Sequence, residues 1–284
     1  MPSQSQITVP IVLIVIGAGA LHAVWNAIAK YLDDRIAAFA LIGIASTVGG
    51  AAVLALTGWP RGAAVPFAVA SALIHIGYEL ALMNSYRLGA FNQVYPIARG
   101  TSPLVVALGA YVLAGERLSP VALAGVAVLA AGLASLALSS GRLTRSELPA
   151  VTAAVITGLV IAGYTVVDGL GVHRAGDPYA YAGLLFLLMG PVMPAVALWR
   201  RPRLEWLTGP AAGKGLLAGA LSLVAYGTVL WAQSLAPLAE VAAIRETSVV
   251  FAALIGMRLF AERFGARRVA AAALVAAGIL LISA

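Results

Sequence analysis

Long apolar runs separated by short polar breaks make up almost the whole chain. An α-helix needs about 20 apolar residues to cross a bilayer core of about 30 Å, and most of these runs have that length. Breaks at charged residues and at Pro- or Gly-rich points predict ten spans. They cover residues 8–30, 36–57, 64–86, 91–113, 118–139, 149–170, 179–199, 213–235, 239–260 and 266–283. The pattern predicts an all-α integral membrane protein and leaves no room for an extramembrane domain.

A four-residue stretch of the first half returns in the second half. Arg-Gly-Thr-Ser at 99–102 is matched by Arg-Glu-Thr-Ser at 245–248, and Glu116-Arg117 is matched by Glu262-Arg263 at the same spacing. An odd number of spans per half turns the second copy upside down relative to the first. We therefore expect two inverted five-helix repeats around a central cavity. Residues 1–141 form the first repeat, 147–284 the second, and 142–146 the connecting loop.

Composition and charge support a membrane location and exclude several other roles. The chain is 62% hydrophobic and 10% charged, whereas a soluble domain has about 45–50% and about 25%. Its net charge of +7 lies mostly between apolar runs, without the basic, aromatic-rich stripe of a nucleic-acid-binding surface. Basic residues concentrate in one set of loops, which predicts that both termini face outwards. The absence of cysteine excludes disulfides and thiolate metal sites, and no motif indicates a metal or cofactor.

Polar and ionisable side chains inside six of the spans are the candidate functional residues. A charge at bilayer depth costs about 2.5–3.5 kcal/mol, so it faces a partner or a cavity. Residues spaced three or four apart share one helix face, and such faces occur in spans 1, 3, 4, 6 and 8, with a charged pair in span 9. The candidate substrate-binding residues are Trp25, Asn26, Tyr78, Glu79, Tyr95, Arg99, Tyr164, Asp168, Tyr226, Arg245 and Glu246, with His22 and His75 as candidates for a proton relay.

Structural alternatives apply to each of these groups. The two arginines can be held by Glu79, Asp168, Glu240 or Glu246 as buried bridges without contacting substrate. Each histidine can be an ordinary core residue. Spans 2, 5, 7 and 10 have no comparable polar face and are expected to form an outer wall. The Ala- and Gly-rich spans 5 and 10 favour close helix packing, with a homodimer interface as the alternative. Proline pairs are expected to interrupt spans 4 and 7.

Several motifs resemble the EamA-type branch of the drug/metabolite transporter superfamily. They are Leu-His-Ala-Val-Trp-Asn at 21–26, Tyr-Pro-Ile-Ala-Arg-Gly-Thr-Ser-Pro at 95–103, Tyr-Thr-Val-Val-Asp-Gly at 164–169 and the two Arg-x-Thr-Ser stretches. The resemblance covers nearly the whole chain. It implies a ten-helix inverted-repeat transporter, usually an exporter of small metabolites. The family also includes uptake carriers and members whose termini are cytoplasmic, the opposite of what the loop charges predict here. Small four-helix relatives couple to protons through a glutamate in span 1, but span 1 of this chain has no carboxylate.

The sequence therefore predicts a multi-pass secondary transporter of the cell inner membrane. Arginines together with acids on the predicted inner faces favour a small polar or zwitterionic metabolite, with amino-acid export by alternating access as the first hypothesis. Proton-coupled efflux of cationic drugs or toxic compounds is the alternative. An enzyme is not expected, because the chain has no H-E-x-x-H, no G-x-S-x-G and no glycine-rich phosphate loop. The expected partners are membrane lipid and a small-molecule metabolite.

Overall fold

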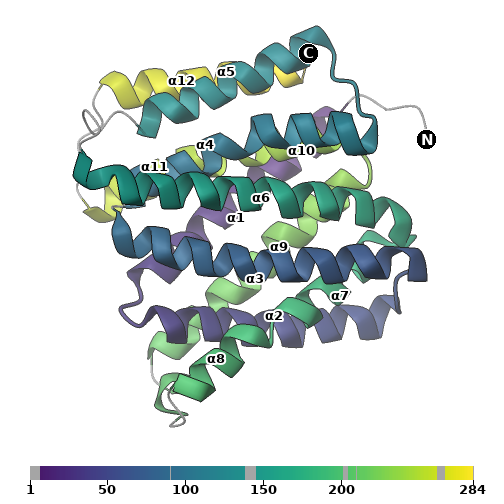
Figure 1. Ribbon diagram of the computed structural model, residues 1–284, viewed down its shortest axis with the longest axis vertical. Helices are drawn as coiled ribbons and strands as arrows, with labels where there is room; N and C mark the ends of the chain where they lie inside the picture. Colours follow the sequence, from purple (N-terminus) through teal and green to yellow (C-terminus); the bar gives the residue numbers. More distant parts are fainter. Residues whose placement is uncertain are drawn as a thin grey trace.

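The computed structural model describes residues 7–89, 91–137, 145–200, 204–208, 210–260 and 266–283, and within these ranges it consists of helices without strands (Figure 1). Most α-helices cross the long body of the molecule from side to side. The α-helices are α1 (Val9–Tyr31), α2 (Arg35–Thr57), α3 (Val65–Leu88), α4 (Phe91–Gly109), α5 (Pro120–Ala137), α6 (Leu148–Ala175), α7 (Pro178–Met189), α8 (Val192–Arg200), α9 (Pro210–Gln233), α10 (Leu238–Arg245), α11 (Ser248–Phe260) and α12 (Ala266–Ile282). A π-helical turn at Ala110–Ala114 extends α4.

The ends of the helices follow ordinary local chemistry. Asp34 caps α2 by accepting a hydrogen bond from the backbone N–H of Ala37, and Asp177 caps α7 through the N–H groups of Tyr179 and Ala180. Such side chains satisfy amide groups that a helix start leaves without partners. Gly115 follows the π-helical turn with a φ of 68°, a conformation that favours glycine. Capping side chains and a glycine turn of this kind allow short connections between the helices.

The prediction of an all-helical membrane protein is confirmed. Among the described residues, seven helical segments are long and apolar enough to cross a membrane, and shorter apolar helices lie at Pro120–Ser135 and Ala270–Ile282. The segment predicted as the ninth span is not continuous, because it divides into α10 and α11 at Glu246 and Thr247.

Proline predicts one helix break correctly and another wrongly. The predicted seventh span ends as α7 at Met189 and restarts as α8 at Val192, next to Pro191, as expected. The predicted fourth span was also expected to be interrupted, but α4 continues through both Pro96 and Pro103. Each proline removes a single backbone hydrogen bond, and a membrane helix tolerates that loss when it is packed in protein. Here α5 and α6 pack along α4.

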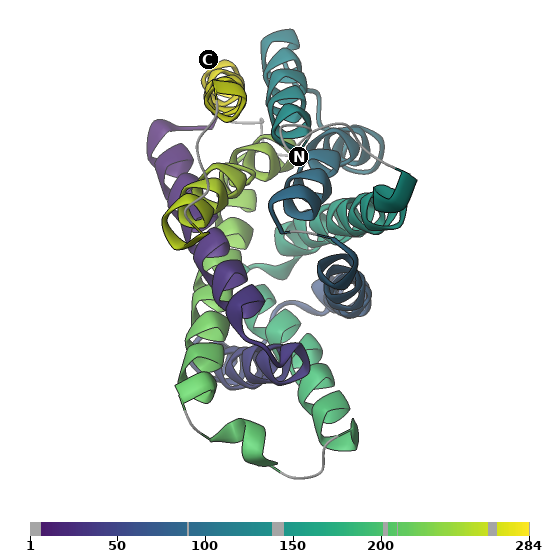
Figure 2. The same ribbon diagram turned by 90° about the vertical axis from the view of Figure 1, so that its left-hand side faces the viewer.

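Glycine allows α5 and α12 to approach closely at one end of the molecule, where they lie side by side (Figure 2). A Cβ atom added at Gly278 would lie 2.7 Å from the backbone nitrogen of Leu129, and one at Gly125 would lie 2.8 Å from the carbonyl oxygen of Gly278. The small residues of these helices therefore allow close packing within the chain, as the sequence analysis expected. A homodimer interface formed by the same helices stays a prediction.

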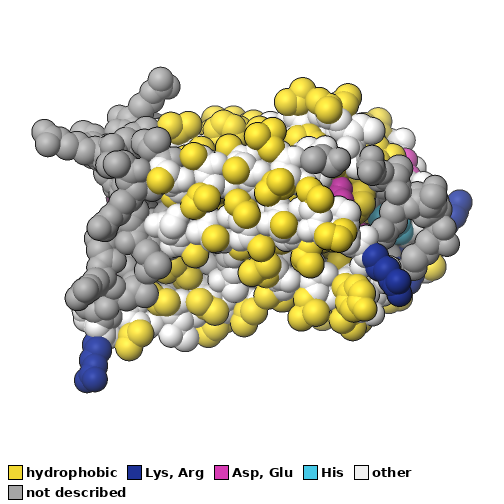
Figure 3. Space-filling view, turned by 90° about the horizontal axis from the view of Figure 1, so that it is seen from above, with side chains coloured by type: hydrophobic (Ala, Val, Ile, Leu, Met, Phe, Trp, Pro, Cys, Tyr) yellow, Lys and Arg dark blue, Asp and Glu magenta, His cyan; other side chains and the backbone are white. Residues whose placement is uncertain are grey.

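Large apolar side chains cover much of the outside. Seen from the side of α5 and α12, hydrophobic side chains fill the middle of the face, and lysine and arginine side chains lie towards its two ends (Figure 3). Leu56 and Trp199 are among the most exposed hydrophobic residues of the described chain. An apolar band with charged ends matches a lipid core between two aqueous surfaces.

Candidate functional site

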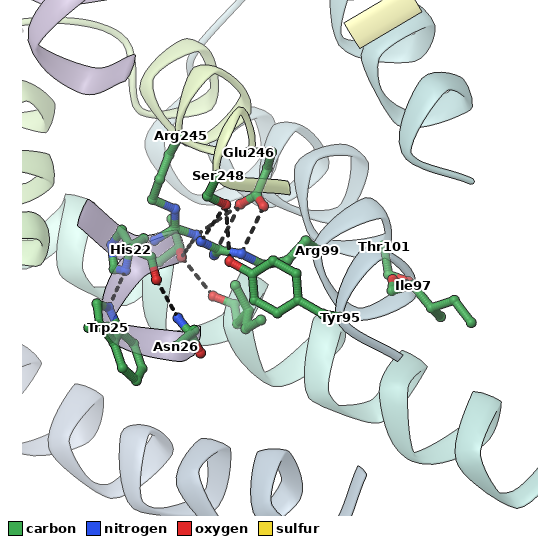
Figure 4. Close-up of polar contacts among 12 residues, drawn as sticks. His22, Trp25, Asn26, Tyr95, Ile97, Arg99, Thr101, Arg245, Glu246 and Ser248 are labelled. Carbon is green, nitrogen blue, oxygen red and sulfur yellow. Dashed lines mark hydrogen bonds and ion pairs between the residues drawn. The ribbon is translucent and has the colours of Figure 1, made fainter. Parts of the chain in front are cut away.

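A cluster of two arginines and one glutamate lies where α4 meets the break between α10 and α11 (Figure 4). Arg99 reaches across from α4, and its Nε lies 3.1 Å from Oε2 of Glu246. Arg245 lies 3.3 Å from the other oxygen of the same carboxylate, through its Nη2. Arg99 also donates to Oγ of Ser248 at 3.0 Å, and the hydroxyl of Tyr95 donates to the same Oγ at 3.3 Å. The two repeated arginines are thus brought together and share one acid.

The helix break positions Glu246 for this role. In an uninterrupted helix, Arg245 and Glu246 would point about 100° apart. Instead, the N–H groups of Glu246 and Thr247 bond to carbonyls three residues back, and α11 begins anew at Ser248. Gly19 of α1 faces this break, where an added Cβ would lie 2.6 Å from Oγ1 of Thr247 and 3.1 Å from the carbonyl of Arg245. Close packing of α1 therefore requires glycine at this position.

The charges of the cluster do not balance. Arg99, Arg245 and Glu246 are all buried, and Arg245 and Glu246 have 0% exposure. Arg245 uses Nη2 for Glu246 and for Oγ1 of Thr165 at 3.5 Å, while its Nε and Nη1 have no hydrogen-bond partner among the described residues. Buried polar groups are normally paired, and an arginine presents five donors in a fixed fork. Arg245 therefore has donors left for a further acceptor.

A second group of polar residues lies on α1 beside α3. The indole N–H of Trp25 donates to Nδ1 of His22 at 2.9 Å, and the amide of Asn26 donates to the carbonyl of His22 at 2.8 Å. The hydroxyl of Tyr86 on α3 donates to Oδ1 of Asn26 at 3.1 Å. An acceptor role for Nδ1 places the proton of a neutral His22 on Nε2, which has no partner among the described residues.

A third group surrounds Asp168 on α6. Its two carboxylate oxygens accept hydrogen bonds from the hydroxyls of Tyr181 at 2.8 Å and Tyr226 at 2.5 Å. The ring of Tyr164 stacks on His75 at a centroid distance of 3.8 Å. Two tyrosines therefore join Asp168 to α7 and α9, and the ring of Tyr164 joins α6 to α3. Among the described residues, Asp168 forms no hydrogen bond or ion pair with Arg99 or Arg245, so it is not their direct partner in this conformation.

Among the described residues, the remaining candidates form no hydrogen bond or ion pair with these groups. Tyr78 of α3 contacts the rings of His75 and Tyr164 edge-on. Glu79 is buried, and its Oε2 has no hydrogen-bond partner among the described residues. Neither histidine bonds to a carboxylate among the described side chains, so the proton relay stays a prediction.

Four residues that contribute to these groups were not among the candidates. Tyr86, Thr165 and Ser248 lie in spans with a predicted polar face or charged pair, but Tyr181 lies on α7, in a span expected to form only outer wall. That expectation is wrong for α7, because its Tyr181 side chain is fully buried against Asp168. Tyrosine among apolar residues in span 7 was the available signal.

Glu116 is followed by Arg117 in the sequence, but the structure pairs Glu116 with the start of α10. Its carboxylate accepts hydrogen bonds from the backbone N–H groups of Leu238 at 2.8 Å and Ala239 at 3.3 Å, the first residues of α10. The matching pair Glu262-Arg263 lies outside the described residues. No group of three or more His, Asp or Glu side chains in the described part of the chain is placed to hold a metal ion.

Comparisons with known proteins agree with the sequence motifs. Residues 148–284 match the sequence model of the EamA-like transporter family, which is part of the drug/metabolite transporter superfamily. The resemblance inferred from the motifs is therefore confirmed. A solved structure titled only "Crystal structure of protein" has the same fold, with a TM-score of 0.78, 18% sequence identity and alignment over 99% of both chains. No curated protein matches this chain.

Proposed function

Because its second half, residues 148–284, belongs to the EamA-like transporter family, this chain is a membrane transporter, and we propose that it exports small zwitterionic metabolites. Amino acids are the substrate class that fits best, and the route is alternating access across the inner membrane. The observation that carries the proposal is the unbalanced charge at Arg99, Arg245 and Glu246, which lies between the two halves of the sequence. Inverted-repeat transporters bind substrate at such an interface.

The packing of the helices supports an inverted repeat of ten spans. In that scheme α1 corresponds to α6, α3 to α9, and α4 to α10 with α11. The contacts follow this exchange, since α6 packs on α3 and α4, and α1 packs on α9, α10 and α11. In the same scheme α5 corresponds to α12 and α2 to α7, and each of these helices packs directly on its counterpart. Figure 1 shows α6 running in the opposite sense to α1, which is the inversion that the scheme requires.

The unpaired donors of Arg245 suit a substrate carboxylate. Hydrogen bonds from a guanidinium to a carboxylate are charge-assisted and about twice as strong as those between neutral groups. On Arg245, Nε and Nη1 have no hydrogen-bond partner among the described residues, while Nη2 is engaged by Glu246. Because Nε and Nη1 lie on different edges of the guanidinium, a carboxylate would bind to one of them by a single hydrogen bond. It would also balance the second positive charge.

The ammonium group of the same substrate requires an acid. Glu79 fits this role best, because its buried Oε2 has no hydrogen-bond partner among the described residues, whereas both oxygens of Asp168 already accept tyrosine hydroxyls. Tyr78, one position before Glu79, is half-buried, and its ring adjoins those of Tyr164 and His75. Aromatic faces attract a cation and pack an apolar side chain. Trp25, Asn26 and Tyr226 complete the proposed lining.

Flux from liposomes tests this assignment. Purified protein in liposomes preloaded with a mixture of labelled amino acids should release a subset of them. Losing a charge-assisted hydrogen bond costs about 1.5–3 kcal/mol, so Arg245→Gln should lower the flux at subsaturating substrate by about 10-fold or more. Arg200→Gln, at the exposed end of α8, is the matched control and should leave flux unchanged. Unchanged flux in both Arg245→Gln and Glu79→Gln would remove these residues from the site.

The same unpaired carboxyl favours one other function. A buried acid beside tyrosine rings also suits proton-coupled efflux of cationic compounds, in which Glu79 exchanges a proton for the cation. This alternative requires a pH gradient and tolerates Arg245→Gln. Measuring flux of an amino acid and of a lipophilic cation, each with and without an imposed gradient, separates the two.

A further inference from the structure

The contact between Glu116 and α10 joins parts of the chain that lie in different halves of the sequence. Glu116 follows Gly115 at the end of the π-helical turn, and its own N–H bonds to the carbonyl of Ala110 at 3.1 Å. The positive φ of Gly115 turns the chain, so that the carboxylate reaches the N-terminus of α10. Two backbone N–H groups there are satisfied by one side chain from the opposite half.

The start of α10 has no cap of its own. Pro237 occupies the N-cap position and supplies no side-chain hydrogen bond. A helix start leaves several N–H groups unpaired and carries partial positive charge, which an acid stabilises. Glu116, from the first half of the chain, therefore accepts the hydrogen bonds that an N-cap side chain would otherwise accept from the first N–H groups of α10. A second acid, Glu240, lies in the first turn of α10 itself, and its Oε2 has no partner among the described residues.

A small apolar cluster lies beside this contact. It is separate from the main core and joins the end of α4, the middle of α6 and the first turns of α10. Its buried members are Val106, Ala110, Ala162, Val166, Leu238, Ala239 and Ala242. Because α10 ends at Arg245, the cluster lies between the Glu116 contact and the arginine cluster along the axis of α10. Glu116 thus holds the helix that closes this end of the site.

We propose that Glu116 is a reversible latch, whose carboxylate keeps α10 closed over the arginine cluster and whose release exposes the cluster from that end. This proposal rests on the proposed function, because a latch has a purpose only if access alternates. The short α10 is suited to such movement, since the break at Glu246 and Thr247 separates it from α11. The opening then requires α10 to lose two hydrogen bonds and the packing of the apolar cluster.

The cysteine-free sequence allows a direct test. Ala242→Cys places a single thiol in the apolar cluster, where the alanine is 1% exposed, and Ala271→Cys places one at an equally buried position of α12. Each is combined with Glu116→Gln and with Glu116→Asp in lipid nanodiscs, without substrate. The rate of labelling by a charged maleimide is then measured.

With Glu116→Gln, labelling at position 242 should rise at least 5-fold, while labelling at position 271 stays unchanged. Glu116→Asp keeps the carboxylate and should restore part of the protection. A general loss of stability would instead raise labelling at both positions, and this result, or no change at position 242, would overturn the latch. Flux measured on the same variants separates the two proposals. Faster labelling at position 242 in a protein that moves no amino acid would leave the latch standing and reject the proposed function.

Discussion

Replacing Glu246 by glutamine should destabilise the protein far more than removing one of its arginine partners. Glu246 is the only acid within ion-pair distance of Arg99 and Arg245 among the described residues. Glu246→Gln leaves two buried guanidinium groups without a counter-charge. Arg245→Gln leaves the pair of Arg99 and Glu246 intact and removes two donor atoms that have no partner in the described part of the chain.

The size of the difference follows from the cost of an uncompensated buried charge. Breaking a buried ion pair by removing one partner costs about 3–5 kcal/mol, and Glu246→Gln unpairs both arginines at once. We expect a loss of at least about 3–5 kcal/mol, which corresponds to a fall of about 6–20 °C in the melting temperature. Arg245→Gln should cost less than half as much, because the excess positive charge disappears with it.

Thermal unfolding of the purified variants in one detergent measures both values. The double variant Arg245→Gln with Glu246→Gln should be more stable than Glu246→Gln alone, since one of the two uncompensated charges is gone. If Arg245→Gln destabilises the protein as much as Glu246→Gln does, the two arginines do not share one acid. The cluster then has no excess positive charge for a substrate carboxylate to balance.

Two other features give separate predictions. Asp168→Asn should cost about 1–3 kcal/mol, because one amide oxygen replaces two carboxylate oxygens that accept from Tyr181 and Tyr226; an unchanged melting temperature would show that these bonds are not formed. Gly278→Ala should cost about 1–3 kcal/mol by pushing α12 away from α5. Gly227→Ala, whose added Cβ meets nothing within 4 Å, should instead stabilise α9 by up to about 1 kcal/mol in the same assay. Equal effects of the two glycine replacements would contradict the close helix approach.

Hydropathy predicted the helical class because the lipid environment restricts the chain so strongly. Without water, a spanning segment must satisfy its backbone internally, so an apolar run of sufficient length becomes a helix. The break in the predicted ninth span has no such signal, since no proline or glycine lies at Glu246 or Thr247. It depends on partners from elsewhere, namely Arg99 on α4 and the close approach of Gly19 on α1.

The candidate site was predicted in its residues but not in its pairings. Charged residues within apolar spans identified both arginines, but the sequence offered four acids as their possible ion-pair partners and did not distinguish between them. The choice of Glu246 depends on the helix break, which turns its carboxylate towards both arginines. Asp168 is bound by Tyr181 from α7, a helix that is otherwise almost entirely apolar. Tertiary packing decided both pairings, and a single sequence does not contain that information in a local form.

Discrimination between an amino acid and its amide is the most direct measure of a carboxylate site at Arg245. The amide keeps the ammonium group and the side chain but has no carboxylate for Arg245. Competition with labelled amino-acid flux in liposomes should therefore be at least about 10-fold weaker for the amide than for the acid in the wild type, from the cost of a charge-assisted hydrogen bond. In Arg245→Gln the two compounds should compete almost equally. Equal competition in the wild type would contradict a carboxylate site at Arg245.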